Sequence, residues 1–376
     1  MALPWLKQAK KLDDIHFQYL STGILPFDLV MRGIPLGALS EIVGWYGTGK
    51  THFAVQMGLR AIKQGYTVVY FDQESALESS RILSLASHLG LSKEDIQDRF
   101  LIFTKEELSF AEMVLERILD LLKDAQNNPD VKYFIVLDSV ASLITQGRAS
   151  GDDKAAVNPL PALLSEFIKH ALLHLGPSCS NVAVLFLNQL RDQIQIGPIP
   201  VRSGISLETG KVPGGNAIKF GAFLRMEIVR TKALRETYKG ETFDIGHEVL
   251  LRITKHKAAP RAQIPAFFEY EYGFCPWRNA IELLLAKKVL TLSGGRIEIG
   301  GKKLYKKEVV QRLRDGDEEM RKALQDLIEN NRHKLVPEPL KESSKDTPAR
   351  LLVESLGFVS SLNQEEKEDE GVGSQD

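Results

Sequence analysis

The sequence feature that most constrains the fold is an eight-residue pattern, GWYGTGKT, that runs from Gly44 to Thr51. It has the spacing G-x-x-x-x-G-K-[ST], in which glycines let the backbone curl so that successive N–H groups face bound phosphates. The pattern has this function only between a strand and a helix. The N-terminus of the helix then adds a partial positive charge beside the phosphates. The strand and the helix are both predicted here, at 39–44 and 51–65. The chain is therefore expected to contain a sheet of parallel strands with crossover helices.

The residues of this loop have separate expected roles in binding a nucleotide. Lys50 should neutralise the β- and γ-phosphates, and the Thr51 hydroxyl should ligate Mg²⁺. A glycine-rich turn that matches by chance is the alternative, and the flanking strand and helix argue against it. The pattern thus predicts ATP and Mg²⁺ as cofactors, with nucleotide contacts from Gly44, Gly47, Thr48, Gly49, Lys50, Thr51 and His52.

Three further strand ends carry polar residues that suit the same chemistry. The apolar run YFIVLD ends in Asp138, which can hold the magnesium shell beside a phosphate loop. The strand TVVYFD at 67–72 leads into Glu74, the candidate for orienting or deprotonating the attacking water; a solvated loop glutamate is the alternative. The strand VAVLFLN at 182–188 is followed by Gln189, whose amide can bond a phosphate oxygen and move when the phosphate leaves. These residues predict a site for ATP hydrolysis.

The pattern of strands and helices divides the chain into four expected segments. Residues 1–20 form a short N-terminal arm, and 21–272 form an α/β core with a mostly parallel, twisted central sheet flanked by helices. Residues 273–335 are expected to be a small α+β domain. Residues 336–376 are rich in Pro, Ser and charge, which predicts a disordered acidic tail.

Composition limits the classes of function that remain. The net charge of −1 excludes a strongly basic field over the whole protein, so nucleic acid would have to bind at local basic loops. Two cysteines, Cys179 and Cys275, make no disulfide framework and no metal-site spacing. No apolar run approaches the roughly 18 residues of a membrane span, and no signal peptide is evident. The expected location is the cytoplasm.

The order of the motifs resembles the RecA family of DNA-strand-exchange recombinases. The resemblance covers about residues 20–275 and is carried by LSTGILPFDLVMRGIPLGALSEIVGWYGTGKT, FDQESALESSR, FIVLDSVASL, FLNQLRDQI, PGGNAIKFGAFLRMEI and ITKHKAAP. The last two stretches go beyond what P-loop ATPases share. The resemblance implies that Glu74 is the catalytic carboxylate and that Gln189 links the γ-phosphate to the DNA-binding loop after it. It also implies adenine contacts at Glu78 and at Arg81, which replaces the family's usual tyrosine.

Lys255 and Lys257 lie two residues apart at the end of the strand-like run VLLRITKHK and should project from one face. A solvated charged edge is one interpretation. The resemblance implies instead that both lysines cross a subunit interface and meet phosphates bound by the neighbour's Lys50 and Glu74, as an arginine finger would.

Two segments resemble the family's DNA-binding loops. The first follows the magnesium aspartate and contributes Arg148 and Lys154. The second is a long Gly-, Pro- and Ser-rich segment, and a loop of that length inside a domain is usually functional or disordered. Its expected DNA contacts, with those of the residues that follow, are Arg191, Arg202, Lys211, Gly214, Gly215, Asn216 and Lys219. Loops with backbone amides and a few cations suit single-strand phosphates; solvated loops of another ATPase are the alternative.

The expected function is that of a DNA-dependent ATPase and recombinase that forms filaments on single-stranded DNA and exchanges strands with a duplex. Its expected partners are single-stranded and double-stranded DNA and further copies of the chain, with loader or single-strand-binding proteins as further candidates. Two alternatives stay open. One is a regulatory or repair ATPase of the recombinase-paralogue type that does not exchange strands, and the other is a hexameric helicase-type motor.

Overall fold

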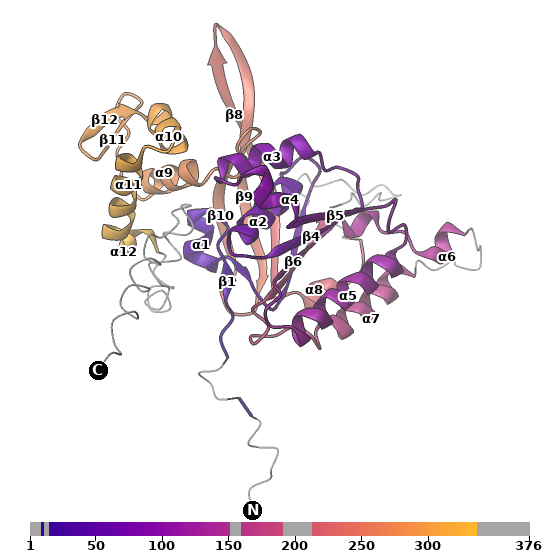
Figure 1. The fold of residues 1–376 in the computed structure, drawn as a ribbon. Helices are drawn as coiled ribbons and strands as arrows, with labels where there is room; N and C mark the ends of the chain where they lie inside the picture. Colours follow the sequence, from indigo (N-terminus) through magenta and orange to yellow (C-terminus); the bar gives the residue numbers. More distant parts are fainter. Residues whose placement is uncertain (1–8, 11–14, 151–158, 191–212, 337–376) are drawn as a thin grey trace, which may run out of the picture. The chain divides into compact units, whose positions relative to one another are not determined.

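The computed structural model describes residues 9–10, 15–150, 159–190 and 213–336 (Figure 1). The chain divides into two units. Of the described residues, those up to Leu20 and those within Ile34–Gly273 form the first unit, and Ser21–Gly33 and those from Phe274 to Val336 form the second. Among the described helices, none has the length and apolar character needed to cross a membrane.

The first unit is built on one eight-stranded sheet with the order β10-β9-β8-β3-β7-β6-β4-β5. Its strands are β3 (Leu39–Gly44), β4 (Thr67–Asp72), β5 (Phe100–Thr104), β6 (Tyr133–Asp138), β7 (Val182–Gln189), β8 (Leu224–Tyr238), β9 (Glu241–His256) and β10 (Ala262–Glu269). Pairing is parallel from β8 through β3 to β5 and antiparallel among β8, β9 and β10. The mostly parallel α/β sheet and its four predicted strands are confirmed.

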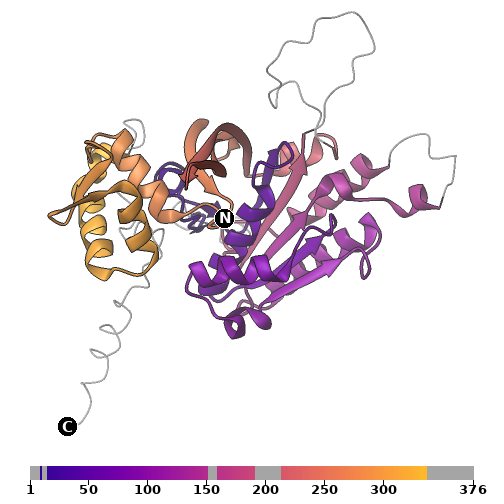
Figure 2. The same cartoon turned by 90° about the horizontal axis from the view of Figure 1, so that it is seen from above.

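Helices cover both faces of this sheet (Figures 1 and 2). They are α2 (Lys50–Lys63), α3 (Ser79–His88), α4 (Lys93–Gln97), α5 (Ala111–Asn127), α7 (Leu160–Ala171) and α8 (Ala217–Gly221). The short helix α6 (Gln146–Ala149) has no buried residue and projects away from the sheet (Figure 1). Val69 and Phe71 of β4 share a buried core with apolar residues of α5 and α7. The alternate residue, Val68, points to the other face, where it packs against Gly58 of α2. Runs of apolar residues form these strands because both faces are buried.

A two-stranded ribbon continues β8 and β9 beyond the sheet (Figure 1). The pairing of β3 with β8 ends at Ile228, and that of β10 with β9 ends at Gly246. From there the two strands pair with each other as far as Tyr238 and Glu241, with β-bulges that shift the register. Short β1 (Tyr19–Leu20) and β2 (Ile34–Pro35) form a separate antiparallel pair.

The second unit is small and mixed. It contains α1 (Leu25–Met31), α9 (Pro276–Ala286), β11 (Arg296–Ile299), β12 (Lys302–Tyr305), α10 (Lys306–Arg314), α11 (Glu318–Asn330) and α12 (Arg332–Leu335). Its boundary differs from the expected one, because residues 21–33 belong to it rather than to the core. The buried Asp28 carboxylate holds this segment by accepting hydrogen bonds from Ser21, Thr22 and Gly23, while α1 packs against α9.

Candidate nucleotide-binding site

The candidate site lies at the carboxyl edge of the parallel strands. Gly44 at the end of β3 pairs with Gln189 at the end of β7, and Asp72 at the end of β4 pairs with Asp138 at the end of β6. Because these strands are parallel neighbours, their polar ends meet at one edge of the sheet. The fold therefore brings the predicted phosphate loop and the predicted carboxylate strand ends together.

The phosphate loop forms the turn from β3 into α2. Gly47 and Gly49 adopt positive φ values of 71° and 93°, which suit glycine, and α2 begins at Lys50. The Lys50 ammonium is buried and donates to the carbonyls of Gly44, at 3.0 Å, and Trp45, at 2.8 Å. Burial lowers the Lys50 pKa, and the nearby Asp138 and Glu74 oppose that effect. A buried cation at a helix N-terminus fits an anionic ligand such as a phosphate.

The residues expected to hold magnesium are in direct contact. The Thr51 hydroxyl donates to the Asp138 carboxylate at 2.8 Å, and the Tyr70 hydroxyl donates to the same oxygen at 2.8 Å. Burial raises the Asp138 pKa to about 6, although both hydrogen bonds oppose the rise. The described residues contain no cluster of three or more His, Cys, Asp or Glu side chains that could hold a metal. A hydroxyl and a carboxylate nevertheless fit Mg²⁺, which takes its other oxygens from phosphates and water.

Glu74 lies at the centre of a hydrogen-bond network beside this pair. One of its carboxylate oxygens accepts from the Ser139 hydroxyl, from the Ser142 hydroxyl at 3.3 Å and from the Gln189 amide. The two predicted catalytic residues Glu74 and Gln189 are thus in contact. The two serines were not anticipated, although Ser139 directly follows the magnesium aspartate in the sequence.

Asp72 positions the segment that carries Glu74. Its buried carboxylate accepts from the backbone N–H groups of Glu74 and Ala76, each at 3.2 Å, and of Leu77, at 3.0 Å. Three backbone bonds to one carboxylate fix the course of the loop after β4. Sequence reasoning missed this role, and the only signal was an acidic residue at the end of the strand.

His52 and Arg81, two predicted nucleotide contacts, are joined by a hydrogen bond. The Arg81 Nε donates to the His52 Nε2 at 3.1 Å, and the guanidinium also donates to the carbonyls of Tyr270 and of Glu271. Burial, with a smaller effect from Arg81, lowers the His52 pKa to about 4, so the ring is neutral. The third predicted contact, Glu78, is exposed before α3 and accepts from Ser80.

The candidate DNA-binding residues are only partly described. Lys154, Arg191, Arg202 and Lys211 lie outside the described residues, as does the acidic tail from residue 337 onward. Arg148 in α6, Gly215 and Asn216 just before α8, and Lys219 within α8 are exposed, whereas Gly214 is buried. Asn188 joins the two ends of the long loop, because its amide donates to the Pro213 carbonyl at 3.0 Å.

The two lysines of the ITKHK motif have different environments. Lys257 is exposed. Lys255 is partly buried, and its ammonium donates to the carbonyls of Lys219, at 2.9 Å, and Phe220, at 2.6 Å, in α8. Burial lowers the Lys255 pKa, and the charges of Lys257 and Arg225 add to that effect. Arg225, unlike these lysines, is buried in an ion pair with Glu41.

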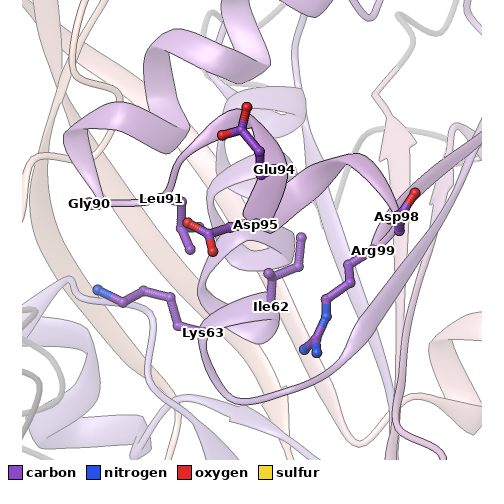
Figure 3. A pocket seen from close by; sticks show the side chains of 8 residues that line it. All are labelled: Ile62, Lys63, Gly90, Leu91, Glu94, Asp95, Asp98 and Arg99. Carbon is purple, nitrogen blue, oxygen red and sulfur yellow. The ribbon is translucent and has the colours of Figure 1, made fainter.

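A separate surface pocket of about 530 Å³ lies at the carboxyl end of α2 and beside α4 (Figure 3). Several of the charged groups around it already have local partners. The Lys63 ammonium donates to the Leu89 carbonyl at 2.9 Å, and Asp95 caps α4 together with Ser92. The phosphate loop leads into the opposite, amino-terminal end of α2, so this pocket is separate from the candidate nucleotide site.

Comparisons with known proteins agree with this geometry. A family model described as the RecA N-terminal domain matches residues 6–274. The chain is 31% identical over 315 residues to "DNA repair protein recA homolog 3, mitochondrial" of Arabidopsis thaliana, a match that covers 82% of the chain and 67% of that protein. It is 28% identical over 322 residues to "Protein RecA" of Aquifex aeolicus, covering 84% of the chain and 82% of that protein.

A similar match is made with "Protein RecA" of Xylella fastidiosa strain M12, at 31% identity over 290 residues, covering 76% of the chain and 75% of that protein. The family match includes every strand of the eight-stranded sheet and every residue of the candidate nucleotide site. The chain therefore belongs to the RecA family of DNA recombination and repair proteins.

Proposed function

We propose that this chain is an ATP-dependent recombinase that forms filaments on single-stranded DNA and promotes homologous pairing and strand exchange. Its ATPase activity, which converts ATP to ADP and phosphate with Mg²⁺, would depend on DNA. Membership of the RecA family supports the general role, and the geometry of the site supports the coupling between nucleotide and DNA.

The observation that carries the proposal is that both ends of the candidate DNA loop are tied to candidate catalytic residues. Before the loop, Gln189 donates to Glu74. After the loop, the carbonyls of Lys219 and Phe220 accept from Lys255. A displacement of the loop by DNA would therefore shift groups on both sides, which is a physical basis for DNA-dependent hydrolysis.

In the proposed reaction, Lys50 and the N–H groups of the loop bind the phosphates, and Thr51 and Asp138 hold Mg²⁺, which neutralises developing charge. Glu74, held by its network, orients and deprotonates the attacking water. Arg81 offers a planar guanidinium on which a base can stack, as an aromatic ring would. Lys255 and Lys257 are proposed to act on the nucleotide of a neighbouring subunit.

Electron microscopy with a non-hydrolysable ATP analogue on single-stranded DNA, followed by a strand-exchange assay, tests the proposal. We expect helical filaments formed without hydrolysis, and joint molecules with a homologous duplex. Filaments or DNA binding without exchange would support a repair paralogue, and closed hexameric rings would support a helicase-type motor. The cytoplasmic location stays a prediction, since one relative is named as mitochondrial.

A further inference from the structure

One buried histidine lies against the phosphate loop and has no part in the chemistry described above. His247 of β9 is 0% exposed, and neither of its ring nitrogens has a hydrogen-bond partner among the described residues. A buried polar group without a partner is uncommon, because it loses its hydrogen bonds to water and gains none in return. Its position therefore calls for a physical explanation.

The backbone fixes where this ring lies. His247 pairs with Phe268 of β10 on one side and with Ala233 of β8 on the other. The preceding residue, Gly246, is in such close contact with β10 that a Cβ there would lie 2.1 Å from the Phe268 carbonyl oxygen. Only glycine permits this approach, so the strand pair holds the imidazole at one place.

That place is beside the phosphate loop. The His247 ring lies 4.9 Å from the Phe268 ring and 5.9 Å from the Tyr270 ring, centroid to centroid. Phe268 in turn packs against Gly49, where a Cβ would lie 3.2 Å from its ring. The histidine and the two aromatic rings thus form a platform that supports the loop from the β9–β10 side.

The main chain of Thr48 is the loop group that faces the imidazole. Burial lowers the His247 pKa, as does the charge of Arg230, whereas a hydrogen-bonding interaction with the Thr48 backbone, which falls short of the geometry of a formed hydrogen bond, raises it. A backbone group that raises the pKa of an imidazole is a carbonyl, because it favours the ring that donates from both nitrogens. In a phosphate-binding turn the N–H groups face the ligand, which leaves carbonyls to face outward.

We propose that His247 is a positioning residue for the nucleotide, whose ring N–H donates to the Thr48 carbonyl when the loop binds the phosphates of Mg·ATP. In this structure the loop is held by its own groups: the Thr48 hydroxyl donates to the Trp45 carbonyl at 2.9 Å, and Lys50 donates to the same carbonyl. Phosphates would take over Lys50, and a small shift of Thr48 would complete the bond to His247. The imidazole thereby favours the nucleotide-binding form of the loop.

The inference rests on the proposed nucleotide site and is tested by affinity and stability rather than by turnover. The parent protein and the variants His247→Phe, His247→Asn and His247→Gln are compared by displacement of a fluorescent nucleotide with Mg·ATP and by urea unfolding without nucleotide. We expect His247→Phe to bind Mg·ATP about three- to tenfold more weakly, the net value of one hydrogen bond. Its urea midpoint should equal or exceed that of the parent, because no unpartnered polar group remains. At least one amide variant should bind within about twofold of the parent.

Ser40→Ala is the matched control. The Ser40 hydroxyl is also fully buried and without a partner among the described residues, on β3 rather than against the loop. This variant should match the parent in Mg·ATP affinity while its urea midpoint stays or rises. Should the phenyl ring prevent folding, His247→Leu takes its place with the same expectations for nucleotide binding.

Two outcomes overturn the proposal: an apolar variant that binds Mg·ATP as tightly as the parent, or amide variants that both lose as much affinity as the apolar one. The second would mean that the shape of the ring, and not its hydrogen bond, supports the loop. A parent protein that binds no Mg·ATP would be a different result, since it would overturn the proposed function itself.

Discussion

At the scale of single residues, the site separates the group expected to act on water from the group that places it. Glu74 accepts three side-chain hydrogen bonds, whereas its backbone is held by Asp72. Glu74 is therefore expected to act on the water, and Asp72 holds the short segment that carries it. Substitutions at the two positions should differ in how far they impair hydrolysis while both leave the phosphate loop intact.

We expect Asp72→Asn to lower ATP hydrolysis by about tenfold or more and Glu74→Gln by about 10²-fold or more, with Mg·ATP affinity within about threefold of the parent in both. An amide has one acceptor oxygen and cannot hold three N–H groups as a carboxylate does. Turnover and nucleotide affinity are measured in parallel, with the exposed Asp130→Asn as control. A loss of affinity equal to the loss of turnover in Asp72→Asn would show that Asp72 supports the whole loop.

The neutral His52 predicts a pH dependence of stability. Its pKa is lowered from 6.5 to about 4 in the folded chain, first by burial and then by Arg81. Between pH values of about 4 and 6.5, His52 binds more protons in the unfolded chain than in the folded chain. The free energy of unfolding therefore rises with pH across this window, and the contribution of His52 to it is lost as the pH falls. After allowance for partial exposure, the contribution is roughly 1 to 2 kcal/mol. Urea unfolding from pH 7 to pH 4, without nucleotide or metal, should show a shallower fall for His52→Gln than for the parent. If both proteins lost stability equally as the pH fell, a group other than His52 would be responsible for the pH dependence.

At the scale of elements, the close approach of β9 and β10 is the contact most sensitive to an added methyl group. Gly246→Ala would place a Cβ 2.1 Å from the Phe268 carbonyl oxygen and 2.8 Å from the Glu269 Cα, so the strands must separate. We expect a loss of about 1 to 3 kcal/mol or more in the free energy of unfolding, measured by urea titration. Gly147→Ala, whose Cβ meets nothing within 4 Å, should be neutral or slightly stabilising. Equal stability of the two variants would contradict the packing described for this pair.

Local patterns identified the elements that are buried on both faces. The runs LSEIVG and YFIVLD are mainly apolar and are buried along almost their whole length, and β3 and β6 begin and end at the predicted residues. The projecting ribbon of β8 and β9 was not predicted, because its mixed polar residues carry no clear period of two. The candidate site residues within motifs were predicted from the same kind of local pattern. The contacts of Asp72 and the proposed role of His247 were not predicted, because both depend on backbone groups that only the folded chain brings near them.

At the scale of the whole molecule, the two lysines of the ITKHK motif predict that hydrolysis depends on assembly. A Lys255→Ala/Lys257→Ala protein and a Glu74→Gln protein should each be nearly inactive. Equimolar mixing should restore about a quarter of parental activity, because half of the Glu74 sites are intact and half of their neighbours carry both lysines. DNA-stimulated ATP hydrolysis is the measurement. No recovery in filaments shown to contain both proteins would mean that the lysines act within their own subunit.

The segment Ser21–Gly33 also affects how the chain can be made. It belongs to the second unit, yet the 240 residues from Ile34 to Gly273 separate it from the rest of that unit. At about 5–20 residues per second, a ribosome needs roughly 12 to 48 seconds to synthesise them. During that interval Leu25, Phe27 and Met31, which are fully buried in the finished protein, have no completed unit to pack into. A nascent chain stalled near residue 270 should therefore expose this apolar helix to chaperones, and should cease to do so once residue 336 has left the ribosome.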